Sequence, residues 1–211
     1  ELLNNLWGVT FYSDNNTIED ISAHDNSRGI ALWIAHNNTL NNITANDNGR
    51  GLFISQSTNN TFSNIVAIDN ANNGIRFDSN TDNNILTDSY IDDNSVGLMI
   101  YWNCEDNVLS NILISNSSSY GLEFYYAINN TVTNVTILDT DDTGIYFTYN
   151  SDYNNVTNSK IQNSTNYGIY FNNNSVKAEN NTLYNNIFNN TVNFFIEDGI
   201  NSSQYMNTSQ T

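Results

Sequence analysis

Proline is absent from the 211 residues of this chain. Because proline cannot donate a backbone hydrogen bond and is excluded from the interior of β-sheets, its absence favours a chain that pairs its N–H groups in a continuous sheet. Cys104 is the only cysteine, which excludes an internal disulfide framework and a zinc site built from cysteines. No apolar run approaches the length of a membrane span, so we expect no membrane insertion.

Basic residues are also scarce. The chain has 5 Lys and Arg against 22 Asp and Glu, which gives a formal net charge of −17. This excess of negative charge argues against nucleic acid and anionic membranes as partners and leaves cations, neutral glycans and protein surfaces. Charged residues make up only 13% and hydrophobic residues 38%, so the composition is that of a folded chain and not of an acidic disordered tail.

A glycine-led tetrapeptide recurs through the sequence: glycine, an apolar residue, any residue, and a second apolar residue. The spacing between successive glycines is 21 to 24 residues, which is typical of a solenoid. The alternation of apolar residues predicts a short strand with two inward side chains in each unit. A ninth, degenerate copy begins at Asn193, where we interpret asparagine as the other residue that tolerates positive φ. The eight glycines are Gly8, Gly29, Gly51, Gly74, Gly97, Gly121, Gly144 and Gly168.

Two further segments recur within each unit. A second apolar segment follows an asparagine, and a third ends in Asp or Asn, as at Asp25-Asn26 and Asp47-Asn48. The pattern therefore predicts about nine coils of 21–25 residues with three short strands each, in a domain covering residues 1–200, followed by a polar C-terminal tail or linker at 201–211. The asparagines of the second segment are Asn16, Asn38, Asn60, Asn84, Asn107, Asn130, Asn155 and Asn181.

Equivalent residues of successive coils should lie above one another, about 4.8 Å apart. We expect Phe77 and Ile100 to be axial neighbours in one apolar row, and Ile75 and Leu98 in another. Stacked asparagines at the turns can hydrogen-bond along the axis, side chain to side chain.

These motifs, over residues 4 to 196, resemble the right-handed parallel β-helix repeats of the NosD and pectate-lyase-like superfamily, and most closely Asn-rich cell-surface proteins of methanogenic archaea. The resemblance implies an all-β, right-handed single-stranded parallel β-helix. It also implies an exported protein, at the cell surface or outside the cell, with polysaccharides or envelope components as partners. It does not select one activity, because lyases, hydrolases, adhesins and envelope proteins share this architecture.

The outward positions of the glycine-led strands are rich in aromatic residues. Such residues stack on sugar rings, and they also pack against a neighbouring subunit. The predicted carbohydrate- or partner-binding face consists of Trp33, Phe53, Tyr101, Glu123, Tyr125, Tyr146 and Tyr170.

Catalytic motifs are incomplete. Asn80-Thr81-Asp82 matches the first motif of polygalacturonases, but no Gly-His-Gly or Arg-Ile-Lys motif follows, and an Asp-Pro-His-Asp epimerase motif is excluded because the chain lacks proline. Four residues are predicted to face outward on neighbouring coils: Arg76, Asp78, Tyr101 and Glu123. They form no recognisable pattern of a basic residue facing a cluster of acidic calcium ligands. We assign no catalytic residue and favour a protein that is not an enzyme.

Asp25, Asp47 and Asp69 occupy equivalent turns and form the candidate calcium column, which Arg28 and Arg50 could instead neutralise. No other cofactor is expected. Candidate N-glycosylation sites are Asn37, Asn42, Asn116, Asn134, Asn163, Asn189 and Asn207.

The function predicted from these features is an extracellular structural protein, such as an envelope, sheath, S-layer or filament subunit, that contacts glycans. The open edges of a β-helix favour self-association or binding to other envelope proteins. The alternatives are a carbohydrate-binding adhesin and a polysaccharide lyase or hydrolase.

Overall fold

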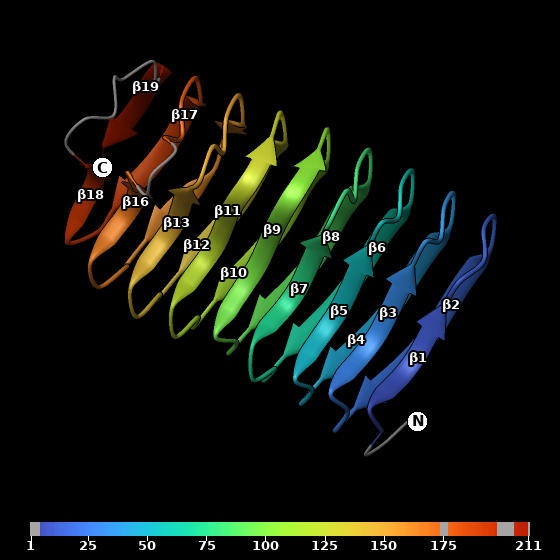
Figure 1. The fold of residues 1–211 in the computed structure, drawn as a ribbon. Helices are drawn as coiled ribbons and strands as arrows, with labels where there is room; N and C mark the ends of the chain where they lie inside the picture. Colours follow the sequence, from blue (N-terminus) through green and yellow to red (C-terminus); the bar gives the residue numbers. More distant parts are fainter. Residues whose placement is uncertain (1–4, 174–176, 198–204, 211) are drawn as a thin grey trace.

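A computed structural model describes residues 5–173, 177–197 and 205–210, the last by their backbone. The described residues form two parallel sheets that wind around one axis as a solenoid (Figure 1). The nine-stranded sheet contains, in axial order, β1 (Trp7–Phe11), β3 (Arg28–Trp33), β5 (Arg50–Ser55), β7 (Asn73–Asp78), β9 (Val96–Glu105), β11 (Tyr120–Ile128), β13 (Thr143–Thr148), β16 (Tyr167–Phe171) and β18 (Val192–Ile196). The ten-stranded sheet contains β2 (Thr17–His24), β4 (Thr39–Asn46), β6 (Thr61–Ile68), β8 (Ile85–Asp92), β10 (Val108–Ser115), β12 (Thr131–Leu138), β14 (Asn155–Thr157), β15 (Lys160–Gln162), β17 (Thr182–Asn189) and β19 (Tyr205–Gln210).

The strand register stacks residues at equivalent repeat positions of successive coils on one another, as predicted. Phe77 of β7 pairs with Ile100 of β9, and Ile75 pairs with Leu98. The degenerate ninth copy is also confirmed, because β18 pairs in parallel with β16 and places Phe194 beside Ile169. The all-β parallel β-helix expected from the repeat is therefore confirmed.

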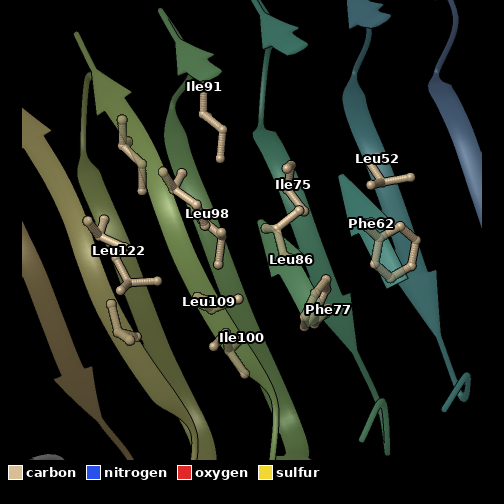
Figure 2. Packing of buried hydrophobic residues seen from close by; sticks show 14 of the residues in the cluster. Leu52, Phe62, Ile75, Phe77, Leu86, Ile91, Leu98, Ile100, Leu109 and Leu122 are labelled. Atoms are coloured by element: carbon tan, nitrogen blue, oxygen red, sulfur yellow. The ribbon is translucent and has the colours of Figure 1, made fainter. Parts of the chain in front are cut away.

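The core fills the space between the two sheets. Figure 2 shows Ile75, Leu98 and Leu122 extending from the nine-stranded sheet toward Leu86 and Leu109 of the ten-stranded sheet. All five side chains are almost completely buried. Burial of apolar side chains from every coil is the main stabilising contribution to a fold with no disulfide.

The second and third predicted segments of each coil form one bent strand in most coils. Asn64 in β6 and Asn134 in β12 have φ values of 54° and 53°, so the chain turns at mid-strand without losing its pairing. In one coil the bend at Asn158 separates β14 from β15. Asparagine and aspartate occupy these bends because their short polar side chains tolerate the left-handed region.

A buried asparagine ladder connects the coils at the turn that precedes the ten-stranded sheet. At each step the Oδ1 atom of one asparagine accepts from the backbone N–H and side-chain amide of the asparagine in the preceding coil, as for Asn84 with Asn107 at 2.9 and 3.1 Å. One predicted member was wrong: Asn154 occupies the ladder between Asn130 and Asn181, whereas Asn155 begins β14. Two adjacent asparagines satisfy the sequence pattern equally, and the register against Asn181 selects the first.

The repeated glycines are required by close backbone approach. A Cβ atom on Gly74 would lie 2.7 Å from Ile91 Cγ2 and 2.8 Å from the Gly97 carbonyl oxygen. The positive φ that we expected for this position was wrong, because none of these repeat glycines lies in the left-handed region. Asn193 takes the glycine position in the ninth copy, where its Oδ1 atom accepts from the Asn190 N–H.

The segment expected to be a polar tail contains a strand. Residues 205–210 form β19, which pairs in parallel with β17. The domain boundary at residue 200 stays a prediction.

Candidate functional site

The outer face of the nine-stranded sheet carries all seven predicted site residues. They lie in two axial rows, two and four residues after each glycine, and the residue before the glycine adds a third row to the same face. Arg28, for example, lies over the ring of Phe53, and Tyr120 stacks on Tyr146. We call this surface the outer face.

The outer face is less exposed than the sequence suggested. Phe53, Glu123 and Tyr146 are only 4%, 8% and 8% exposed, although they point away from the core cluster. Side chains on parallel strands are separated by about one coil height, so large residues in the flanking rows cover the middle row. The face is therefore a packed surface layer with a few openings.

One opening is a hollow of about 300 Å³ over β3, β5 and β7. We call it the arginine hollow. The guanidinium carbon of Arg28 lies 4.3 Å from the ring centroid of Trp7 and 4.9 Å from that of Phe53, and Arg50 lies 5.8 Å from Phe53. The lining residues are Arg28, Trp33, Arg50, Phe53, Ser55, Gln56, Asp78 and Ser79.

The three arginines of the chain meet at this hollow. Arg76 pairs with Asp78 at its edge, Nη2 to Oδ2, at 2.6 Å. Burial, followed by repulsion from Arg76 and Arg28, lowers the pKa of Arg50, and attraction to Asp78 opposes this shift. Arg28 Nε is buried without a hydrogen-bond partner. The region therefore carries an excess of positive charge within a chain of net charge −17.

Two strands beyond β7, the outer face becomes tyrosine-rich around Glu123 of β11. Burial raises the pKa of Glu123 to about 7, and attraction to Arg76 opposes the shift. Burial also raises the pKa of Tyr120 and of Tyr146, whose rings stack at 4.5 Å. Tyr146 also contacts Tyr170 at 5.2 Å between centroids.

A third part of the outer face is a group of five aromatic residues in the second halves of β9 and β11 and directly after β13. We call this group the aromatic shelf: Tyr101, Trp102, Tyr125, Tyr126 and Tyr149. The sequence interpretation identified only Tyr101 and Tyr125. Trp102, Tyr126 and Tyr149 each lie five residues after a repeat glycine, a recurrence that could have identified them.

Arg28 and Arg50 lie elsewhere than predicted. Arg28 and Arg50 were expected beside the aspartate column, but they lie over Phe53 on the outer face. The carboxylate of Asp25 instead contacts His24 Nδ1 at 2.9 Å. The position directly before glycine, shared with Trp7 and Tyr120, was the signal that placed the arginines.

The aspartate column and the described sequon asparagines are exposed, in turns, mid-strand bends and strand ends. Asp25, Asp47 and Asp69 are exposed and left-handed, and the Asp25 N–H donates to the Asp47 carbonyl at 3.1 Å. Asp69 lines a hollow of about 220 Å³ together with Asp93 and Ser118. Calcium binding here stays a prediction. Sequon asparagines that are exposed are Asn37, Asn42, Asn116, Asn134, Asn163 and Asn189, and the side chain of Asn207 lies outside the described residues.

Cys104 is unsuited to an intermolecular disulfide. It is completely buried, and burial raises its thiol pKa to about 12. The thiolate needed for exchange is therefore strongly disfavoured.

Comparisons with known families agree with this architecture. A family model described as the right handed beta helix region matches residues 4–111. This chain belongs to the right-handed β-helix proteins. A model described as periplasmic copper-binding protein (NosD) matches residues 77–211. No curated protein matches the sequence.

Solved structures of the same fold come from proteins of different function. The A-module of mannuronan C-5 epimerase AlgE6 from Azotobacter vinelandii superposes with a TM-score of 0.83 and 21% identity, over 94% of this chain and 58% of its own. The periplasmic alginate epimerase AlgG gives 0.78 and 13%, over 96% and 61%. PfbA, a surface adhesin of Streptococcus pneumoniae, gives 0.62 and 11%, over 84% and 59%. The chain thus spans about 60% of each of these structures.

The copper in the NosD description can be tested against the side chains. Copper sites use imidazole, thiolate and thioether ligands held close together. His24 contacts Asp25, His36 contacts Thr58 and Cys104 is buried on β9, so these side chains belong to separate environments. Across the described part of the chain, His, Cys, Asp and Glu form no group of three or more suited to a metal. The described residues do not fit a copper site.

Among the described residues, none belongs to a helix of the length and apolar character needed to cross a bilayer.

Proposed function

We propose that this protein binds an acidic polysaccharide through the arginine hollow, as a carbohydrate-binding protein of the cell surface or periplasm. The observation that carries the proposal is that Arg28 and Arg50 line the hollow beside Trp33 and Phe53, while Arg76, the third arginine of the chain, pairs with Asp78 at its edge. Elsewhere the chain is dominated by negative charge, and such a surface would repel an anionic ligand.

The hollow combines the two interactions that recognise an acidic sugar. Arginine presents several donors in a planar fork that suits a carboxylate or sulfate, and aromatic rings stack on the apolar face of a sugar. Arg28 and Arg50 are held over Phe53, so their guanidinium groups are positioned before a ligand arrives. Preorganisation of this kind lowers the entropic cost of binding.

The related structures support a carbohydrate-related or surface role. Two of them are named as epimerases of mannuronan or alginate and one as a surface adhesin. Their identities of 11–21% support the fold alone, so the ligand class is argued from the hollow. A cell-surface or periplasmic location is consistent with the names of the NosD model, AlgG and PfbA.

Arg50→Gln is the direct test. Affinity for alginate and polygalacturonate, measured by calorimetry at low salt, should fall at least about tenfold, because one charge-assisted hydrogen bond contributes about 1.5–3 kcal/mol. Raising the salt concentration should weaken binding by the wild type, and neutral dextran should bind less well than either polyuronate.

Lys160→Gln is the matched control. It removes the same charge from an exposed position on β15, in the other sheet, and should leave affinity unchanged. Arg50→Lys keeps the positive charge and should therefore bind more tightly than Arg50→Gln and less tightly than the wild type. Equal affinities for the Arg50→Gln and Lys160→Gln variants would contradict the proposal, as would polyuronate chains that are shortened or unsaturated after incubation, since these would indicate an enzyme.

The role of envelope, sheath, S-layer or filament subunit stays a prediction. It requires contacts between copies of the chain, which sizing over a range of protein concentrations would detect.

A further inference from the structure

The aromatic shelf combines exposure with backbone strain. Trp102, Tyr126 and Tyr149 have φ values of 63°, 49° and 44°, in the left-handed region. Bulky residues rarely adopt this conformation because the Cβ atom approaches the following carbonyl oxygen. Strained residues persist where the surrounding structure holds them, and they concentrate at functional sites.

The same turn in other coils shows that the fold does not require aromatic residues there. Gln56 and Ser79 occupy the equivalent position, five residues after Gly51 and Gly74, with φ values of 50° and 47°. The left-handed turn is thus a property of the coil, and Ile34, five residues after Gly29 with φ of 50°, satisfies it as Gln56 and Ser79 do, without an aromatic ring. The aromatic side chains of the shelf therefore need an explanation beyond the backbone.

The rings of the shelf form one connected surface across three coils. Trp102 and Tyr126 are 5.0 Å apart between centroids, and Tyr126 and Tyr149 are 5.5 Å apart. Tyr125 supports this surface from the adjacent row at 4.5 Å from Tyr149. Trp102 is 45% exposed, so part of the surface faces solvent.

The chemistry of the shelf differs from that of the arginine hollow. Arg76 lies over the ring of Tyr101 at 4.2 Å, at the end of the shelf nearest the hollow. Asn103 and Asn150 directly follow Trp102 and Tyr149 in the sequence, and both have left-handed backbone and are at least partly exposed. Aromatic faces and amides suit the C–H face and the hydroxyl groups of an uncharged sugar, whereas a carboxylate on the shelf would have to be desolvated.

We propose that the aromatic shelf is a second sugar subsite that takes an uncharged pyranose. This rests on the proposed function, since the two subsites would hold one chain. Rows of the outer face run along the axis at about 4.8 Å per coil, so a glycan that lies along the axis can reach from β5 to β11. The ligand is then an acidic heteropolysaccharide, with its charged unit in the hollow and a neutral unit on the shelf.

Trp102→Asn tests the shelf with little risk to the fold, because asparagine is well tolerated in left-handed backbone. The probes are gellan, an acidic polymer in which uronate alternates with neutral sugars, and polygalacturonate, which is uronate throughout. Trp102→Asn and Tyr126→Asn should each lower affinity for gellan at least about tenfold and change affinity for polygalacturonate less than about twofold.

Tyr153→Asn is the matched control, an exposed tyrosine (59% exposed) with φ of 58° at a different turn. It should leave both affinities unchanged. A Trp102→Asn protein that binds both polymers as the wild type does would overturn the shelf subsite while leaving the hollow intact. A wild type that binds neither polymer would overturn the proposed function as well. Loss of a dimer or larger oligomer in Trp102→Asn, seen by sizing, would assign the shelf to a second copy of this chain and overturn the sugar subsite.

Discussion

The two sheets of this solenoid have similar inner faces and different outer faces. Inward, both present apolar rows that are almost completely buried. Outward, the ten-stranded sheet carries mostly short polar side chains that bond along the axis, such as Ser63 to Asn41 at 3.0 Å. The exceptions are large residues on β8, β10 and β17, such as Ile85, Leu113 and Tyr184. The nine-stranded sheet instead carries aromatic residues and the three arginines.

The difference between the outer faces shows which side chains the fold requires and which it does not. A parallel β-helix requires inward apolar residues, tight turns and pairing between coils, and both sheets supply these. The ten-stranded sheet demonstrates that short polar residues suffice on the outside. The large residues on the outer face of the nine-stranded sheet are therefore the better candidates for function.

The largest contrast should come from adjacent residues on opposite sides of one strand. Phe124→Ala removes an inward ring that stacks on Phe147 at 4.6 Å, and it should lower the free energy of unfolding by about 3–5 kcal/mol. Tyr125→Ala, on the outer face, should cost clearly less. Urea unfolding measures both, and equal losses would show that the outer face contributes as much stability as the core.

A substitution in the asparagine ladder should lower the free energy of unfolding nearly as much. Asn107→Ala leaves the Thr81 carbonyl and the Asn84 N–H without their side-chain partner, and burial makes each loss costly, so we expect a loss of about 2–4 kcal/mol. Asn72→Ala, at an exposed position, should change stability by less than about 0.5 kcal/mol. A similar small effect at Asn107 would mean that the ladder is dispensable.

Glu123 should make stability depend on pH. Burial raises its pKa in the folded state from 4.5 to about 7, so its contribution is fully present below about pH 4.5 and is lost as the pH rises through 7. Relative to Glu123→Gln, the wild type should lose up to about 3 kcal/mol over this range. Unfolding of both proteins from pH 4 to 8 measures it, with the exposed Glu105→Gln as control. If the difference in free energy of unfolding between the wild type and Glu123→Gln did not change with pH, the raised pKa of Glu123 would be refuted.

The smallest effect is expected on the other sheet. Tyr184 is 52% exposed on β17. Tyr184→Ser should change stability by less than about 0.5 kcal/mol and leave polysaccharide affinity unchanged, because the residue lies outside the arginine hollow and the aromatic shelf. A weaker affinity would extend the binding surface to the ten-stranded sheet and remove the functional contrast between the two faces.

The sequence predicted the features that repeat. The spacing of the glycines fixes which residues stack, so the pairing of Phe77 with Ile100 could be stated in advance. The sequence was less informative where two adjacent residues fit one pattern, as with Asn154 and Asn155. A shift of one residue in the strand register decides which of them enters the asparagine ladder. The sequence also missed Trp102, since this residue lies beyond the two apolar positions of the repeat, at a position that polar residues such as Gln56 and Ser79 also occupy.

The sequence alone determined the period, the parallel stacking and the rows of the core, because each depends on the order of apolar residues and glycines along the chain. Only the tertiary structure decided that Arg28, Arg50 and Arg76 meet beside Asp78, and that the middle row of the outer face is buried. The physical reason is that these contacts join side chains from different coils, where size, direction and charge decide the packing and no period in the sequence specifies them.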